Sequence, residues 1–173
     1  MEAQDRGGAV HLGPGEGLAV RMPGAQLLTR KVGGARTGGA YSLFEVAVQP
    51  GGGQSPHIQH EEDECFYVLE GLFAFLMERD KTEAVSGSLL YVPKGTLHAF
   101  ENVGGAPGKL LMSQTPGGLH ERFVDETGEP VFGFAVAGSE PSARGPLGTE
   151  RSASKAAEYG IETVSQPYGR SER

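Results

Sequence analysis

Two polar stretches of this chain carry the side-chain types that bind divalent transition metals. Residues 57–64 read His-Ile-Gln-His-Glu-Glu-Asp-Glu, and residues 93–98 end in His98. Imidazole nitrogens and carboxylate oxygens are the ligands that such metals prefer. Gly71 follows the first stretch and Asn102 follows the second, and both are turn-forming residue types. The sequence therefore suggests one metal site assembled from two halves.

If the first stretch is a strand, its side chains alternate between two faces. His57 and Gln59 then share one face, and His60 points to the opposite one. Glu64 can return to the first face after an acidic turn, and a neighbouring strand can bring His98 opposite His57. The spacing alone leaves a second interpretation equally open, in which the three histidines are surface residues among acids.

Length and composition predict one domain that binds neither nucleic acid nor a membrane. The chain has 173 residues, enough for one domain with a real core. It has 15 Lys and Arg against 22 Asp and Glu, a net charge of −7, and no basic stripe. No apolar run approaches the roughly 18 residues that span a bilayer, and Met1–Arg6 lack the pattern of a signal peptide. With Cys65 as the single cysteine, these features favour a cytoplasmic location.

Short apolar runs separated by turns predict an all-β fold. Apolar side chains alternate with other residues in Phe44, Val46 and Val48, as in a half-buried strand. The 28 glycines and 11 prolines are scattered without a repeat, which favours many short elements. Glu70-Gly71 lies between two such runs and predicts a tight hairpin turn. We expect strands at 25–32, 41–48, 65–69, 72–77, 89–92 and 109–113, arranged as an antiparallel sandwich or barrel.

The expected organisation is one β-domain at 18–116, preceded by a flexible tail at 1–17. Residues 117–173 are expected to form an appendage of helices and loops that packs on the barrel. Within it, the pattern predicts helices at 119–125 and 154–159, a strand or buried linker at 131–137, a loop at 139–149 and a disordered end at 168–173.

The register of these residues resembles the two sequence motifs of the cupin superfamily. Both motifs lie between Gly51 and Asn102. The first is matched by Gly51, His57, Gln59, Glu64 and Gly71, and the second, at every defining position, by Gly87, Pro93, Gly95, His98 and Asn102. The chain is most similar to small single-domain cupins of the quercetin 2,3-dioxygenase-like kind. The resemblance implies a jelly-roll β-barrel or sandwich.

The resemblance also implies one metal inside the barrel, held by His57, Gln59, Glu64 and His98. The family has a histidine where this chain has Gln59, and a glutamine carbonyl oxygen is a harder and weaker ligand. Gln59 can bind the metal, a bulge can turn His60 inward instead, or the site can bind metal weakly or not at all. We favour a metal site with Gln59 as ligand, because strand alternation needs no special backbone. The metal would be Fe, Mn, Ni, Co, Cu or Zn, since this ligand set does not choose among them.

Glu64 is also the candidate catalytic residue. In quercetinase-like cupins the corresponding glutamate handles a substrate proton, and a carboxylate in an apolar cavity would have a raised pKa that suits this role. A plain ligand role for Glu64 is equally open. His120 and Arg122 fall on the expected helix, and either could reach a ligand if that helix covers the barrel mouth, but the interpretation as surface residues is favoured. Cys65 is interpreted as a packing residue.

The resemblance implies an enzyme that acts on a small aromatic or enolic molecule, flavonoid-like or polyketide-like, bound in the barrel. A dioxygenase is the first expectation, with Glu64 accepting the substrate proton. A non-oxidative cyclase, isomerase or lyase that uses the metal as a Lewis acid is the alternative. A ligand-binding cupin without catalysis ranks lower, because no helix-turn-helix pattern accompanies it. We also expect a homodimer, since jelly-roll cupins commonly pair through their strands.

Overall fold

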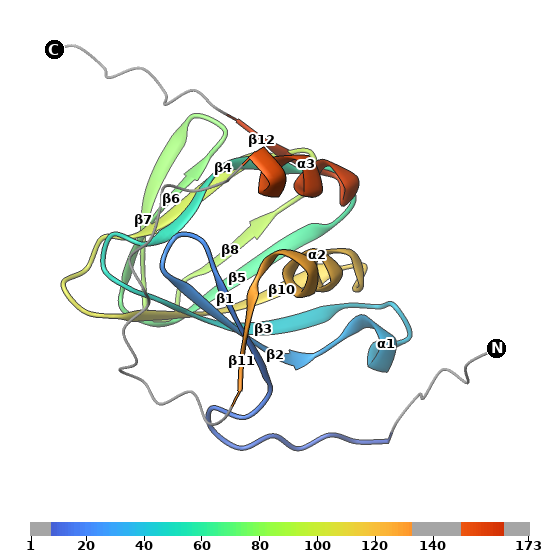
Figure 1. Cartoon of the computed structure of the whole chain (residues 1–173). Helices are drawn as coiled ribbons and strands as arrows, with labels where there is room; N and C mark the ends of the chain where they lie inside the picture. The colour runs from blue at the N-terminus through green and yellow to red at the C-terminus, as the bar shows by residue number, and fades with distance from the viewer. Residues whose placement is uncertain (1–7, 133–149, 165–173) are drawn as a thin grey trace, which may run out of the picture.

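The computed structural model describes residues 8–132 and 150–164, which fold into two antiparallel sheets that face each other (Figure 1). One sheet has, in spatial order, β11 (Glu129–Val131), β1 (Leu18–Met22), β2 (Gln26–Val32), β3 (Ser42–Val48), β10 (Gly108–Thr115), β5 (Asp63–Glu70) and β8 (Leu89–Val92). The other has β12 (Ile161–Thr163), β4 (Gly53–Gln59), β9 (Leu97–Asn102), β6 (Leu72–Met77) and β7 (Asp80–Val85). The all-β jelly-roll prediction is confirmed.

The core lies between the sheets and follows from the alternation of side chains along the strands. In β3 every second residue is buried, from Ser42 to Val48. Neighbouring aromatic rings in the core lie 5.4 to 6.4 Å apart, a spacing typical of packed aromatic pairs. The phenylalanines of this cluster, all at most 3% exposed, are Phe44, Phe66, Phe73, Phe75 and Phe100.

All six expected strands are present, but the expected hairpin at Gly71 is not. Gly71 has a φ of 97° and joins β5 to β6, yet the two strands belong to different sheets. Strand β5 pairs with β10 and β8, whereas β6 pairs with β7 and β9. A tight turn between two apolar runs sets their proximity but does not decide which strands pair with them. Gly71 therefore carries the chain from one sheet to the other.

The C-terminal segment adds an edge strand to each sheet. Strand β11 pairs with β1, and β12 pairs with β4 so that Ile161 lies opposite Gln59. The helices α2 (Leu119–Thr127) and α3 (Glu150–Glu158) contact each other beside the same end of the two sheets (Figure 1). The short α1 (Gly34–Thr37) links β2 to β3.

Both helices fall close to their expected positions. The expectations for 139–149, 168–173, most of 131–137 and the first part of the tail lie outside the described residues. No helix in the described part is long and apolar enough to cross a membrane.

Candidate metal centre

Three strands bring four of the expected ligands onto the inner faces of the sheets. Strand β4 carries His57 and Gln59, β9 places His98 directly opposite His57, and β5 of the other sheet carries Glu64. All four are buried: the exposed fractions are 6% for His57, 2% for Gln59, 1% for Glu64 and 0% for His98. The side chains of β4 therefore alternate between the two faces of the strand, as the sequence predicts.

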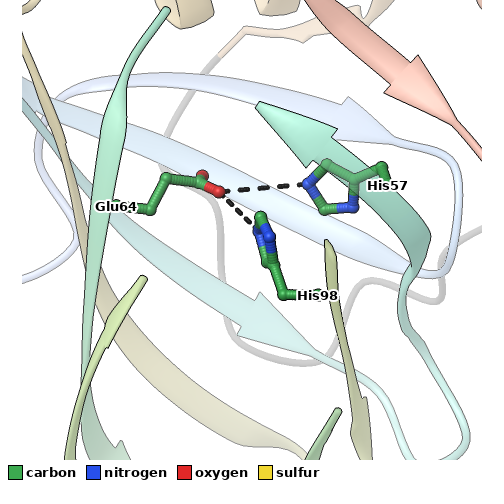
Figure 2. A group of neighbouring side chains, drawn as sticks. All are labelled: His57, Glu64 and His98. Atoms are coloured by element: carbon green, nitrogen blue, oxygen red, sulfur yellow. Dashed lines mark ion pairs between the residues drawn. The ribbon is translucent and has the colours of Figure 1, made fainter. Parts of the chain in front are cut away.

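Two imidazoles face one carboxylate oxygen in this layer. Glu64 Oε2 lies 3.9 Å from His57 Nε2 and 2.6 Å from His98 Nε2 (Figure 2). The candidate ligand atoms of the three residues all lie within 4.8 Å of one another. The two rings stand 4.2 Å apart between centroids. The arrangement leaves one common point that all three donor atoms approach.

Backbone hydrogen bonds fix the orientation of both rings. His57 Nδ1 donates to the carbonyl oxygen of Ser55 at 2.8 Å, and His98 Nδ1 donates to that of Thr96 at 3.0 Å. His57, whose pKa is lowered, therefore presents the lone pair of Nε2 to the centre, and His98 Nε2 would do so once a metal displaces its proton. His57 Nε2 has no hydrogen-bond partner among the described residues, whereas His98 Nε2 and Glu64 Oε2 pair with each other at 2.6 Å. Buried polar atoms are nearly always paired, so a bound cation would give His57 Nε2 a partner and replace the proton between His98 and Glu64.

Two consecutive side-chain hydrogen bonds orient the carboxylate of Glu64. Gln114 Nε2 donates to Glu64 Oε1 at 3.3 Å, and Ser42 Oγ donates to Gln114 Oε1 at 3.2 Å. All three side chains are buried. One oxygen of the carboxylate is thus occupied by an amide, and the other is left for the centre. Outer contacts of this kind orient metal ligands in proteins.

The charge state of Glu64 differs from the one the sequence suggests. Burial alone would raise the pKa of Glu64, but His98 and then His57 outweigh burial and lower that pKa to about 2. Burial and the neighbouring His98 lower the pKa of His57 to about 4. Burial also lowers the pKa of His98, yet the Glu64 carboxylate outweighs it and the net direction is upward. The expected raised pKa of Glu64 is therefore wrong, because the apolar cavity also contains two imidazoles.

The structure places His60 away from this centre. Its side chain is 48% exposed, and its Nε2 lies 2.8 Å from a carboxylate oxygen of Glu162 on β12. The irregularity in the β4–β9 pairing lies between Gln54 and His57, ahead of the ligands rather than after them. Gln59 therefore keeps the inward position, and His60 faces outward as alternation predicts.

His120 belongs to the buried polar layer, against the expectation that it lies on the surface. It is 2% exposed, its Nδ1 lies 3.2 Å from Gln59 Nε2, and its ring meets Phe44 edge-on at 5.8 Å between centroids. Burial lowers its pKa. The sequence signal for this position is helical spacing, because His120, Phe123 and Val124 lie at i, i+3 and i+4 on one face.

Glu62 is a second buried residue that the sequence analysis left without a role. It is 1% exposed, and its Oε1 accepts the backbone N–H groups of Leu119 and His120, each at 3.2 Å. Burial raises its pKa to about 7, although these two hydrogen bonds act in the opposite direction. Glu62 thus ties the first turn of α2, and with it His120, to the strand that carries Glu64.

The side chains of His57, Glu64 and His98 have little contact with solvent, at most 7% exposed. Two surface hollows of about 430 and 340 Å³ lie elsewhere, the first beside Lys31 and Glu45 and the second beside Pro56 and Lys81. Neither of them borders His57 or Glu64.

Comparisons with known proteins agree with this fold. Residues 44–113 match the family model described as Cupin domain. An uncharacterised protein of Methanocaldococcus jannaschii is 34% identical over 80 residues, which is 46% of this chain and 64% of that protein. An uncharacterised protein of Streptomyces coelicolor is 36% identical over 50 residues, which is 29% of this chain and 45% of that protein. The chain thus matches less than two thirds of the length of either relative.

Solved structures show the same architecture. KdgF from Halomonas sp. superposes with a TM-score of 0.56 and 17% identity, over 64% of this chain and 94% of that one. A predicted oxalate decarboxylase from Thermotoga maritima superposes with a TM-score of 0.50 and 20% identity, over 53% of this chain and 80% of that one. At these identities the likeness shows the fold alone.

Proposed function

Because this chain carries a cupin domain at residues 44–113 and has the cupin fold, we propose that it is a metal-dependent enzyme acting on a small enolic or aromatic molecule. A dioxygenase of the quercetinase-like kind is the first candidate reaction. The observation that carries the proposal is the convergence of His57 Nε2, His98 Nε2 and Glu64 Oε2, all buried and within 4.8 Å of one another. Two imidazoles and one carboxylate are also the ligand set of mononuclear non-haem iron oxygenases.

In this proposal the metal ligands are His57, Glu64, His98 and the carbonyl oxygen of Gln59. The amide nitrogen of Gln59 faces His120 at 3.2 Å, which leaves the carbonyl oxygen available. When bound, the metal supplies Lewis acidity and, if it is redox-active, electrons for the reaction with O2. The chain's own contribution is a fixed and enclosed ligand set, because both rings are held by backbone carbonyl oxygens and Glu64 is held by Gln114.

Glu64 is the proposed catalytic residue as well as a ligand. Its Oε1 accepts the Gln114 amide while its Oε2 faces the centre, so Oε2 is the oxygen placed to take a proton from a bound substrate. The low pKa of Glu64 in the metal-free protein makes it a weak base. Proton transfer to Glu64 therefore requires a substrate hydroxyl group whose pKa is lowered by the metal. An enolic or phenolic hydroxyl group meets this requirement.

A non-oxidative lyase or isomerase is the second candidate, and the low exposure of the centre favours it. The side chains of His57, His98 and Glu64 are at most 7% exposed, which suits a small molecule better than one of flavonoid size. The similar structure from Thermotoga maritima is described as a predicted oxalate decarboxylase, and oxalate is a small dianion. A neutral amide ligand in place of an imidazole also leaves the redox tuning of the metal less constrained.

Oxygen dependence separates the two candidates. The protein reconstituted with Fe²⁺ is incubated with quercetin, with a small β-diketone and with oxalate, in air and under strict exclusion of O2, while substrate loss and O2 uptake are followed. Glu64→Ala and the exposed variant His60→Ala serve as matched controls. Substrate loss with matching O2 uptake, abolished by Glu64→Ala alone, is the expected result.

Turnover that persists without O2 would replace the dioxygenase proposal with the non-oxidative one. The enzyme proposal fails if the protein binds none of the six candidate metals. It also fails if Glu64→Ala and His60→Ala affect turnover equally, because only Glu64 lies at the centre.

A further inference from the structure

His120 reaches the buried layer from outside both cupin motifs. It is the second residue of α2, and its ring extends from Gln59 on one sheet to Phe44 on the other. Its side chain is almost fully buried, and the first turn of its helix is fixed by Glu62. None of the proposed ligand roles uses its second ring nitrogen.

The hydrogen bond to Gln59 decides which ring nitrogen of His120 carries the proton. An amide nitrogen can only donate, so Gln59 Nε2 donates and His120 Nδ1 accepts across 3.2 Å. A ring that accepts at Nδ1 is neutral and holds its proton on Nε2. His57 has the opposite arrangement, because it donates from Nδ1 to a backbone carbonyl oxygen. His57 thus presents a lone pair, and His120 presents an N–H group.

The Nε2–H group of His120 has no acceptor among the described residues, although it is buried. Buried donors nearly always have a partner, because removing an unpaired donor from water is costly. The ring contacts Gln59, a proposed ligand on one sheet, and Phe44 on the other sheet. An acceptor for its N–H group therefore belongs in the same enclosed layer. A bound molecule with an oxygen atom would supply that acceptor.

We propose that His120 binds the substrate rather than the metal, by donating its Nε2–H to an oxygen atom of a small monoanion. The inference rests on the proposed metal site and specifies the substrate class that the site takes. Two neutral imidazoles, a neutral amide and the Glu64 carboxylate leave one positive charge of a divalent metal uncompensated. A buried charge without a counter-ion is costly. A carboxylate or an enolate with a second oxygen atom balances that charge and accepts from His120.

Acetate and Co²⁺ are suitable probes, because the visible absorption of Co²⁺ reports an anion that joins its ligands. His120→Asn is the decisive variant: its carbonyl oxygen can still accept from Gln59, but the donor at the Nε2 position is lost. Arg122→Ala, an exposed position on the same helix, is the matched control. Acetate is titrated into the Co²⁺-loaded protein and both variants, and Co²⁺ affinity is measured separately by calorimetry. Nitrogen-15 spectra of the metal-free protein report which nitrogen of each histidine is protonated.

We expect the nitrogen spectra to show protonated Nε2 for His120 and protonated Nδ1 for His57. His120→Asn should weaken acetate binding roughly 10- to 100-fold, the loss expected for a hydrogen bond to a charged group, and leave Co²⁺ affinity as in Arg122→Ala. Protonated Nδ1 at His120, or unchanged acetate affinity with Co²⁺ bound, would overturn this inference alone. Loss of Co²⁺ from His120→Asn would show that His120 serves the metal instead. A native chain that binds no Co²⁺ would overturn the proposed function and this inference together.

Discussion

Metal binding should stabilise this fold, and the stabilisation should depend on His98 and not on His60. His98 is 0% exposed and its Nε2 approaches Glu64, whereas His60 lies in the same stretch of polar residues but faces outward to Glu162. The perturbation is addition of Zn²⁺ or Co²⁺ to metal-free protein, compared among the native chain, His98→Ala and His60→Ala. Each variant is compared with its own metal-free form, so any packing loss at His98 does not enter the result.

The size of the effect follows from how far the metal favours the folded state, in which His57, His98 and Glu64 lie together. A ligand that binds only the folded state adds about 2.7 kcal/mol at 100 times its Kd. For a chain of this length each kcal/mol raises Tm by about 2–4 °C, so the expected shift is roughly 5–10 °C.

Scanning calorimetry at pH 7 measures the shift. The native chain and His60→Ala should show the full increase, and His98→Ala should show little or none. An increase that survives in His98→Ala but disappears in His60→Ala would refute the assignment of the inward face. The absence of any shift with all six candidate metals would refute the metal site itself.

Four further predictions concern Glu62, Gln59 and the edge strand β8. Glu62→Ala should destabilise α2 by about 1–3 kcal/mol, measured by urea unfolding, because two backbone N–H groups lose their acceptor. Since the pKa of Glu62 is raised to about 7, the carboxyl contributes stability below pH 4.5 that is lost as pH rises through 7, and Glu62→Gln should remove this pH dependence. Gln59→His should tighten Zn²⁺ binding roughly 10-fold or more in calorimetric titration, because imidazole is the better ligand; equal affinity would argue against Gln59 as a ligand. We also expect the homodimer of the sequence analysis to use edge strand β8, where Leu89 and Tyr91 are 63% and 54% exposed, so Leu89→Lys should convert a dimer to a monomer in light scattering.

The amino-acid sequence determined the local features of this protein. Alternation along a strand is a property of the backbone, so His57 and Gln59 face inward and His60 faces outward without any information from other elements. The strand periodicity and the motif spacing were likewise sufficient to predict the all-β fold. The helix around residues 119–125 was also readable, because its start and length depend on neighbouring residues.

Tertiary structure decided everything that depends on which distant elements meet. Gly71 changes sheets instead of closing a hairpin, because β5 and β6 each pair with strands far away in the sequence. The pKa of Glu64 falls instead of rising, because β4 and β9 bring two imidazoles to a carboxylate on the opposite sheet. His120 is buried because Glu62 fixes the start of α2 against the centre. The local sequence determines which side chains can serve as metal ligands. The polar groups that surround these ligands come from non-local packing, which spacing along the chain does not specify.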